Sequence, residues 1–277
     1  MSKITSLFSL DGKVIVITGG AGFLGRKHAE AIAAFGGKPV ILDLNKKKVQ
    51  DAVQDLNIKF PKSSIGYTVD ITNENQILKN SEKIISRYGK IDGLINNASN
   101  NPKVEENSEI EFSRLENFPL DLWQHDINVG LTGAFLCTKI YGTKIAKNEN
   151  GGVIVNISSD LGIISPDQRL YKKEELCESN QPVKPITYSV AKAGIIGLTK
   201  YTSTYWAEKN VRCNVICPGG VENGQPTNFI KALTSKIPLN RLASPDEYQG
   251  TIIWILSDAA SYVNGATISI DGGRTVW

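Results

Sequence analysis

Short runs of β-branched and other apolar residues alternate along the chain with longer stretches of helical character. The apolar runs are nearly continuous, which is typical of strands buried on both faces of a parallel sheet. The expected strands are Lys13–Thr18, Pro39–Asp43, Ser64–Val69, Ile91–Ile95, Gly152–Ile157, Val211–Ile216 and Ala266–Ile270. The expected helices between them are residues 23–36, 46–59, 73–89, 121–147, 187–209 and 245–257.

This alternation predicts an α/β protein with a three-layer, doubly wound parallel β-sheet of seven strands, of the Rossmann type. No repeat, low-complexity tract or linker divides the chain, so we expect one domain over residues 1–277. Two polar insertions, near residues 99–120 and 166–185, interrupt the alternation of expected strands and helices. Both follow strands, so we expect them to lie over the substrate site, at the sheet edge where ligands bind.

The net charge and the lengths of the apolar runs exclude several classes of protein. The 31 basic and 28 acidic residues leave a net charge of +3, too small to indicate binding to nucleic acid or to an anionic membrane. No apolar run is as long as a membrane span, and residues 1–11 lack the pattern of a signal peptide. We therefore expect a cytoplasmic protein that acts on a small molecule, with neither nucleic acid nor membrane as a partner.

The residues that usually bind metals are few, and no metal site is expected. The four cysteines include no Cys-x-x-Cys pair, and His28 and His125 are the two histidines. We expect each histidine to be a packing or surface residue. Cys213 and Cys217 share one face of an expected strand, and we expect both to be buried, unreactive thiols.

A glycine-rich turn follows the first expected strand, with the sequence Thr18-Gly-Gly-Ala-Gly-Phe-Leu-Gly-Arg26. Between an apolar strand and a helix, such a turn lets the backbone approach a pyrophosphate at the helix N-terminus. The dinucleotide contacts predicted in this turn are Gly19, Gly22, Phe23, Leu24 and Gly25.

Asp43 ends the second expected strand, at about the distance beyond Gly25 where a carboxylate can accept hydrogen bonds from the adenosine ribose. A carboxylate there repels a 2′-phosphate, which favours NAD over NADP as the cofactor. The alternative is that Asp43 caps the helix that follows.

Tyr188 and Lys192 lie one turn apart on an expected helix, so a phenol and an ammonium share one face. An ammonium favours the phenolate form, as a general acid/base that works near neutral pH requires. The same spacing recurs at Tyr205 and Lys209, nearly five turns further along and away from the ligand edge. We therefore interpret Tyr205 as a packing or interface residue.

Hydroxyl and amide side chains complete the candidate catalytic set. Ser158 and Ser159 end the strand before the Tyr188 helix, where a serine can hydrogen-bond a substrate oxygen beside the phenol. Asn128 lies in another expected helix, where a buried amide needs a partner and can hold a water for proton relay.

Over essentially its whole length, the chain resembles the short-chain dehydrogenase/reductase family. The features that match are, in order, Thr18-Gly-Gly with Gly22 and Gly25, Asp70, Asn96-Asn-Ala98, Asn128, Ser159 with Tyr188 and Lys192, and Pro218-Gly219. The resemblance implies that Tyr188 exchanges a proton with the substrate oxygen during hydride transfer to or from a nicotinamide. It implies that Lys192 lowers the pKa of the tyrosine and binds the nicotinamide ribose, that Ser159 orients the substrate, and that Asn128 supports a relay water.

The resemblance also implies further cofactor contacts. Asp70 and Ile71 would flank the adenine, Asn97 would shape the floor under the cofactor, and the backbone at Val221 would face the nicotinamide amide. Ala98, Pro218 and Gly219 complete the predicted contacts.

Several positions depart from the pattern of the family's single-domain branch. The TGxxGxxG spacing is typical of the extended, sugar-nucleotide branch, and Phe23 stands where the single-domain branch has its middle glycine. The chain beyond Lys192 is nevertheless too short for the extended branch's substrate domain, which favours the single-domain branch. Ser99 and Asn223 replace a usual glycine and threonine.

The interval between Ser159 and Tyr188 is about twice as long as is usual in the family. This insertion and the last residues, 274–277, resemble dehydrogenases of flagellin-glycosylation and surface-polysaccharide biosynthesis. An acidic or phosphorylated sugar would then be the substrate. The candidate anion contacts are Arg169, Lys172, Lys173 and Lys184, unless they simply form a solvated, charged loop.

Three hypotheses of function remain. The leading one is an NAD-dependent oxidoreductase that acts on a secondary alcohol or ketone, with sugar derivatives of surface-glycan biosynthesis among the candidate substrates. The second is a nucleotide-sugar epimerase or dehydratase with tightly bound NAD. The third is an NAD-sensing protein without chemistry, which the presence of both Tyr188 and Lys192 opposes. By analogy with the family, a homo-oligomer, dimer or tetramer, is expected.

Overall fold

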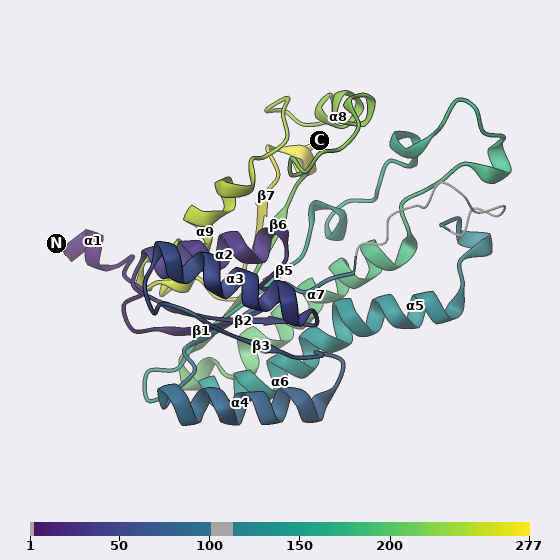
Figure 1. Cartoon of the computed structure of the whole chain (residues 1–277). Helices are drawn as coiled ribbons and strands as arrows, with labels where there is room; N and C mark the ends of the chain where they lie inside the picture. The colour runs from purple at the N-terminus through teal and green to yellow at the C-terminus, as the bar shows by residue number, and fades with distance from the viewer. Residues whose placement is uncertain (1–2, 101–112) are drawn as a thin grey trace.

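Seven parallel strands form the central sheet of the computed structural model, which describes residues 3–100 and 113–277 (Figure 1). The strands are β1 (Val14–Thr18), β2 (Lys38–Asp43), β3 (Ile65–Thr68), β4 (Gly93–Asn96), β5 (Gly152–Ile157), β6 (Val211–Pro218) and β7 (Thr267–Ile270). Their order across the sheet is β3-β2-β1-β4-β5-β6-β7. The prediction of a doubly wound parallel sheet with seven strands is confirmed.

Helices cover both faces of the sheet (Figure 1). The longer helices are α2 (Phe23–Ala34), α3 (Lys46–Lys59), α4 (Glu74–Tyr88), α5 (Leu120–Ile127), α6 (Gly133–Ile145), α7 (Ile186–Tyr205), α8 (Thr227–Thr234) and α9 (Gln249–Leu256). Helices α2, α3 and α9 contribute to the core on one face, and α4 and α6 to the core on the other. Helix α7 packs on β5 and β6.

The burial of the strands explains why their sequences are apolar throughout. In β1, Ile15 and Ile17 face one core cluster, while Val14 and Val16 face the other. All five residues of β1 are buried, because helices lie on both sides of it. Cys213 and Cys217 are also fully buried, as expected. Burial raises the pKa of the Cys213 thiol to about 12.

Four helical features differ from the expectation. The short helix α1 (Lys3–Ser6) and helix α8 were not anticipated. The expected helix over residues 121–147 contains a π-helical turn, Asn128–Thr132, between α5 and α6. The helix expected at 187–209 ends at Tyr205 and is followed by a short 3₁₀ turn. In the described part of the chain, no helix is both long and apolar enough to cross a bilayer.

The direction of winding reverses between β1 and β4, because β2 and β3 lie on one side of β1 and the later strands on the other. In doubly wound sheets, this reversal opens a crevice at the carboxyl ends of the strands. The segment 166–185 and the N-terminal end of α7 lie near one another at this edge (Figure 1). Most of the other predicted insertion, residues 101–112, lies outside the described residues.

His28 is a buried histidine in α2, with 2% of its surface exposed, and among the described residues neither ring nitrogen has a hydrogen-bond partner. Burial lowers its pKa to about 4 from an ordinary value of 6.5. The unfolded chain therefore takes up a proton at a higher pH than the folded chain does. The free energy of unfolding is expected to fall by about 3 kcal/mol as the pH falls from 6.5 to about 4.

Urea denaturation at several pH values measures this effect. His28→Leu should remove most of the pH dependence, because the variant lacks the buried imidazole. The matched control is His125→Gln, since His125 is exposed on α5 and its variant should keep the wild-type slope. Equal slopes for His28→Leu and the wild type would contradict the prediction.

Candidate active site

A cleft of about 520 Å³ lies at the carboxyl ends of the strands, where the winding reverses. It brings together most of the predicted site residues. The predicted catalytic residues that line it are Ser159, Tyr188 and Lys192. The predicted cofactor contacts that line it are Gly19, Gly22, Phe23, Leu24, Asp43, Asp70, Ile71, Asn97, Ala98, Pro218, Gly219 and Val221.

Hydrogen bonds hold the glycine-rich turn against the residues that follow β4. The Thr18 hydroxyl accepts hydrogen bonds from the backbone N–H of Asn97 at 3.0 Å and of Ala98 at 3.1 Å. The Asn97 amide in turn donates to the carbonyls of Thr18 and Gly19, both at 3.0 Å. Gly19 has a φ of +60°, in the left-handed region that glycine adopts without strain.

Gly25 does not line the cleft, and its predicted contact with the cofactor stays a prediction. A Cβ at this position would lie 2.3 Å from the carbonyl oxygen of Gly19, so glycine is needed for close packing of α2 on the turn. Phe23, in place of the family's middle glycine, is 44% exposed and forms part of the cleft wall.

The N-terminus of α2 opens into the cleft and fits the phosphates of a dinucleotide. Gly22 is its N-cap and offers no side-chain cap, and the first turn of α2 carries no acidic residue. The free backbone N–H groups and the positive end of the helix dipole therefore favour an anion here. Among the described residues, no cluster of His, Cys, Asp or Glu is arranged to hold a metal ion.

Asp43 ends β2 and lines the cleft, partly exposed. It does not cap α3: the N-cap is Asn45, whose side-chain oxygen accepts from the backbone N–H of Lys48 at 3.0 Å. The alternative interpretation of Asp43 as a helix cap is therefore wrong. Asp70, further along the cleft, accepts hydrogen bonds from the Thr72 backbone and hydroxyl at 2.9 and 2.7 Å.

Tyr188 lies in the first turn of α7, with its phenol in the cleft beside Ser159. Burial raises the pKa of Tyr188, the hydrogen bond with Ser159 acts in the opposite direction, and the charge of Asp160 adds to the rise. The net direction is opposite to the one expected from the Lys192 ammonium, because burial dominates. The positive charges nearby oppose the rise by favouring phenolate.

Lys192 is buried one turn further along α7. Its ammonium donates to the Ile157 carbonyl at 2.9 Å and lies 5.8 Å from the centre of the Tyr188 ring. Burial lowers the pKa of Lys192 to about 8. Ser158 supports this arrangement, since its hydroxyl donates to the Lys192 carbonyl at 2.7 Å and ties β5 to α7. Ser159 is left to face the phenol.

Asn128 is not the buried amide that the sequence predicted. It begins the π-helical turn, is exposed, does not line the cleft, and accepts a 3.4 Å hydrogen bond from Thr132 on the same turn. Val129 lines the cleft instead, and Gly130 packs against Ala191 of α7. The expected burial of Asn128 is therefore wrong, and its role in proton relay stays a prediction.

A buried ion pair beneath the site was not anticipated. The guanidinium of Arg274, near the C-terminus, pairs with Asp160, and both side chains are less than a tenth exposed. Asp160 also accepts from the Ser159 hydroxyl at 2.7 Å and from the Leu161 backbone at 2.8 Å. The arginine thus fixes the carboxylate that holds Ser159 in place.

The cations of the 166–185 insertion have different surroundings. Arg169 pairs with Asp167 at 2.8 Å, and Lys172 lies 3.4 Å from Glu178. Lys184 instead reaches the site, with its ammonium 3.9 Å from the centre of the Tyr188 ring. Of the four candidate anion contacts, Lys184 is the one that the structure places beside the phenol.

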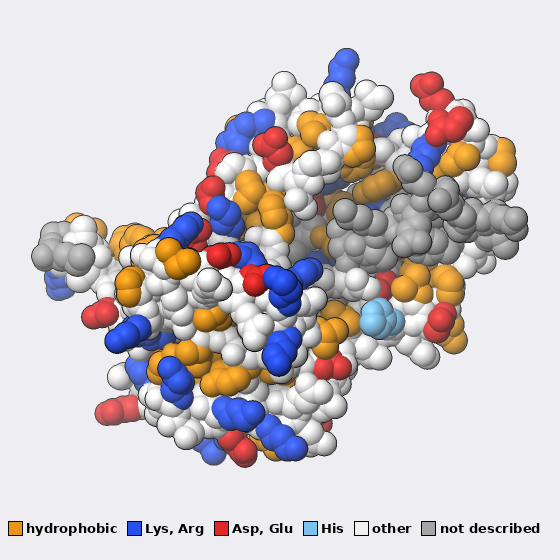
Figure 2. Space-filling view, viewed as in Figure 1, with side chains coloured by type: hydrophobic (Ala, Val, Ile, Leu, Met, Phe, Trp, Pro, Cys, Tyr) orange, Lys and Arg blue, Asp and Glu red, His pale blue; other side chains and the backbone are white. Residues whose placement is uncertain are grey.

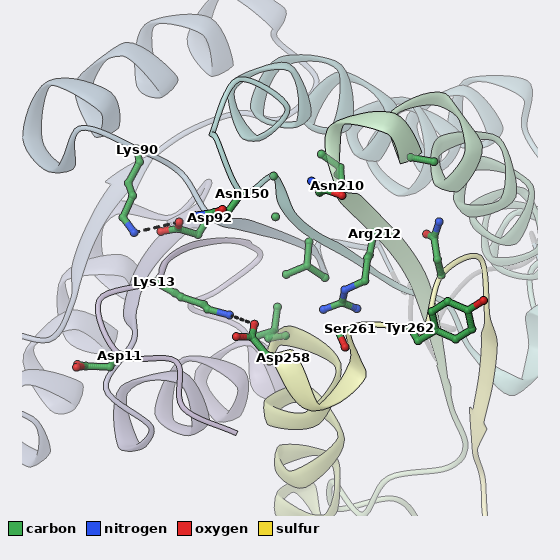
Figure 3. Close-up of a pocket in the computed structure, with 17 residues that line it drawn as sticks. Asp11, Lys13, Lys90, Asp92, Asn150, Asn210, Arg212, Asp258, Ser261 and Tyr262 are labelled. Carbon is green, nitrogen blue, oxygen red and sulfur yellow. Dashed lines mark hydrogen bonds and ion pairs between the residues drawn. The ribbon is translucent and has the colours of Figure 1, made fainter. Parts of the chain in front are cut away.

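A larger hollow of about 810 Å³ lies at the opposite edge of the sheet (Figure 3). Four of its charged side chains form two ion pairs: Lys13 pairs with Asp258 at 2.8 Å, and Lys90 with Asp92 at 3.1 Å. The Arg212 guanidinium donates to backbone carbonyls at the C-terminal end of α9. These contacts are structural, so the hollow is not the reactive site.

A phenol, a neighbouring ammonium and a glycine-lined helix N-terminus in one switch-point cleft define a nicotinamide-dependent oxidoreductase. The family model described as "short chain dehydrogenase" matches residues 13–171. The model described as "enoyl-(acyl carrier protein) reductase" matches residues 177–275. The chain belongs to the short-chain dehydrogenase/reductase family.

Curated relatives and solved structures match almost the full chain. It is 31% identical to a 3-oxoacyl-(acyl-carrier-protein) reductase of Thermotoga maritima, over 96% of this chain and 99% of that protein. It is 30% identical to an NAD-dependent glycerol dehydrogenase of Listeria innocua, over 97% and 96%. A gluconate 5-dehydrogenase of Burkholderia cenocepacia, solved with NADP and tartrate, superposes with a TM-score of 0.82 at 25% identity, over 99% of both chains.

Proposed function

We propose that this protein is an NAD-dependent dehydrogenase of a secondary alcohol in a sugar, polyol or sugar acid. The observation that carries the proposal is the cleft that Asp43, Tyr188 and Lys192 line together. When bound, the cofactor supplies a nicotinamide that accepts hydride from the carbinol carbon. Ser159 orients the substrate hydroxyl by hydrogen bonding, and Tyr188 takes its proton through the phenol oxygen.

Lys192 has two roles in this proposal. Its ammonium stabilises phenolate at Tyr188, and the fixed bond to the Ile157 carbonyl holds it beside the place proposed for the nicotinamide ribose. In the reverse direction, Tyr188 returns the proton to the oxygen of a ketone as hydride arrives. We propose that Asn128 does not take part through its side chain, because it is exposed outside the cleft.

The choice of NAD rests on Asp43. Its carboxylate lies at the end of β2, where it accepts the Asn45 backbone N–H at 3.2 Å; it can also accept hydrogen bonds from both ribose hydroxyls and repel a 2′-phosphate. The end of the cleft that Ser159, Tyr188 and Lys192 line favours a polyhydroxylated substrate, because a hydroxyl, a phenol and an ammonium group converge there. The glycerol and gluconate dehydrogenases named above act on such compounds. A role in surface-glycan biosynthesis is supported by the resemblance of the insertion and the C-terminal residues.

A substrate panel tests the proposal. Reduction of NAD⁺ and NADP⁺ and oxidation of NADH and NADPH are followed over polyols, free, phosphorylated and nucleotide-linked sugars, sugar acids, simple alcohols and 3-oxoacyl thioesters. We expect turnover with at least one sugar or polyol, and faster turnover with NAD than with NADP. Turnover confined to acyl thioesters or to NADP would contradict the proposal.

The glycine spacing Gly19-x-x-Gly22-x-x-Gly25 favours a second candidate, a nucleotide-sugar epimerase or dehydratase. Such an enzyme uses hydride transfer only transiently and keeps its NAD. Purified protein with stoichiometric NAD, converting a nucleotide sugar without net NADH change, would support this candidate over the first.

We also propose that the protein is a homo-oligomer, with the homotetramer of the family as the expected state. Helices α6 and α7 present a groove whose aromatic residues Phe135, Tyr201 and Tyr205 are 48%, 67% and 63% exposed. Large exposed aromatic residues side by side favour burial against a second copy. Light scattering measures the mass in solution, and a monomer would contradict this proposal. On the face that Figure 2 shows, Lys and Arg side chains are scattered among acidic and apolar ones.

A further inference from the structure

The single proton of the Ser159 hydroxyl is bound to a neighbouring carboxylate. Ser159 donates to Asp160 at 2.7 Å, and the direction of this hydrogen bond is fixed, because an ionised carboxylate can only accept. The Leu161 backbone N–H donates to the same Asp160 oxygen at 2.8 Å and to the Ser159 oxygen at 3.2 Å. To donate to a substrate oxygen, the Ser159 hydroxyl therefore has to leave Asp160.

Asp160 has a second side-chain partner, Arg274, on its other carboxylate oxygen. Both side chains are buried, and a guanidinium is not deprotonated in proteins. A carboxylate that shares its charge with a guanidinium is a weaker acceptor for a further donor than an unpaired one. The difference is largest where little water screens the charges. Arg274 therefore controls how strongly Asp160 holds the Ser159 proton.

The turn after β7 holds the backbone of Arg274 in place. The Asp271 carboxylate accepts from the backbone N–H groups of Gly273 and Thr275, both at 2.9 Å. Gly273 has a φ of +90°, in the left-handed region that glycine adopts without strain, and it precedes the short 3₁₀ turn Arg274–Val276. The Arg274 side chain therefore extends to Asp160 from an anchored backbone.

The charge of Asp160 acts on two phenols near Ser159. Burial raises the pKa of Tyr188, and the Asp160 charge adds to this rise. Burial also raises the pKa of Tyr171, in the insertion, to about 12, while the Arg274 charge opposes this rise and the Asp160 charge adds to it. The buried ion pair therefore lies close to the reacting groups, and its arginine offsets the charge of the carboxylate there.

We propose that Arg274 is a positioning residue that weakens the hold of Asp160 on the Ser159 proton and so frees the hydroxyl for the substrate oxygen. This inference rests on the proposed role of Ser159 in orienting the substrate. As the substrate hydroxyl loses its proton to Tyr188, negative charge develops on its oxygen, and a hydroxyl donor stabilises the oxygen most at that stage. The effect of Arg274 is therefore expected in kcat rather than in KM.

A double-mutant cycle tests the proposal. The kcat of alcohol oxidation is measured at the high-pH plateau of each variant, so that a changed pKa of Tyr188 does not affect the comparison. Arg274→Met is expected to lower kcat about tenfold, with KM within about twofold of the wild type. In Ser159→Ala, the same substitution should change kcat by about twofold or less, because the hydroxyl on which Arg274 acts is absent. An equal loss in both backgrounds would overturn the proposal.

A neutral version of the buried pair gives a second kinetic readout. Asp160→Asn/Arg274→Met leaves no unpaired charge in the interior, and an amide oxygen at position 160 is a weaker acceptor for Ser159 than a carboxylate. Its kcat is expected to recover to within about threefold of the wild type. A folded double variant with the same loss as Arg274→Met would contradict the proposal, because the arginine would then act through packing and not through its charge.

The proton of the hydrogen bond between Ser159 and Asp160 reports on the same interaction without a substrate. Its ¹H NMR resonance in the full-length protein is assigned by its loss in Ser159→Ala. A stronger hydrogen bond moves such a resonance downfield, so a downfield shift is expected in Arg274→Met. A resonance that does not move would show that Arg274 has no influence on the hydrogen bond.

The matched control is Arg241→Met, which breaks an exposed ion pair with Glu247, at 2.6 Å, outside the cleft. Its kcat and its Ser159 proton resonance should be those of the wild type. If Arg274→Met does not fold, as judged by thermal melting, Arg274→Gln replaces it, because the amide can donate to Asp160 without a charge.

Failure of this inference is distinguishable from failure of the proposed function. The cycle can use any substrate that the enzyme turns over, so a substrate outside the proposed class would refute the proposed function and leave the effect of Arg274 measurable. The NMR measurement does not depend on turnover at all.

Discussion

Tyr188→Phe is expected to lower kcat by about 1,000-fold, because the variant keeps the ring but loses the oxygen that exchanges the substrate proton. Burial of the ring and its contacts with the two ammonium groups do not depend on the hydroxyl, so the fold and the cleft should persist. NADH should therefore bind with an affinity within a few-fold of the wild type. Steady-state kinetics and a fluorescence titration with NADH measure the two quantities.

The chain contains its own control for this experiment. Tyr205 and Lys209 repeat the Tyr-x-x-x-Lys spacing at the far end of α7, where Tyr205 is 63% exposed and lies outside the cleft. Tyr205→Phe should keep wild-type turnover. Retained turnover in Tyr188→Phe would refute the assignment of this phenol as acid/base.

Asp43→Ser is expected to raise the preference for NADPH over NADH by about 100-fold. Among the effects predicted here, only that of Tyr188→Phe is larger. A hydrogen bond to a charged group contributes about 1.5–3 kcal/mol, and NADH would lose it. NADPH would at the same time be freed from repulsion between the carboxylate and its 2′-phosphate. The first turn of α3, with Lys46 and Lys48 exposed beyond Asn45, would then favour the phosphate.

Binding of both reduced cofactors to Asp43→Ser and the wild type, followed by fluorescence, checks this prediction. The control is Asp51→Ser, which removes one carboxylate of the same helix, bound to Lys47 at 2.9 Å, outside the cleft. Its NADPH/NADH ratio should stay close to that of the wild type. An unchanged ratio in Asp43→Ser would show that Asp43 does not bind the ribose.

The sheet was predictable because its strands are buried on both faces. Helices cover both sides of β1, so its residues Val14–Thr18 have to be apolar throughout, and such a run stands out in the sequence. Helix α8 was missed because its apolar residues Phe229 and Leu233 pack only on a small local cluster. A short helix of this kind lacks the long periodicity that identifies α4 or α7.

The candidate site was predicted where its residues follow strands or begin helices. Ser159 and Asp43 come at strand ends, and Tyr188 begins α7, so the topology alone brings them to one edge. The position of Asn128 could not be predicted in this way. A π turn changes which side chains face the sheet, and the turn at Asn128–Thr132 leaves no mark in the hydrophobic pattern.

Contacts between residues that are distant in sequence could not be predicted either. Nothing in the sequence joins Arg274 to Asp160, because their contact depends on the path of the C-terminal residues past β7. Lys184 was one of four candidate cations in a charged insertion. The 3₁₀ turns of that insertion and the hydrogen bond from the Lys184 backbone to Gln168 place Lys184, of the four, beside Tyr188. Both features depend on tertiary contacts.

A crystal structure of the full chain with NADH most directly tests the central claim, that one cleft places a nicotinamide beside the Tyr188 phenol. We expect the pyrophosphate at the N-terminus of α2, the adenosine ribose on Asp43, and the reactive face of the nicotinamide turned toward Tyr188 and Ser159. A dinucleotide bound elsewhere, or a phenol oxygen directed away from the nicotinamide ring, would contradict the account.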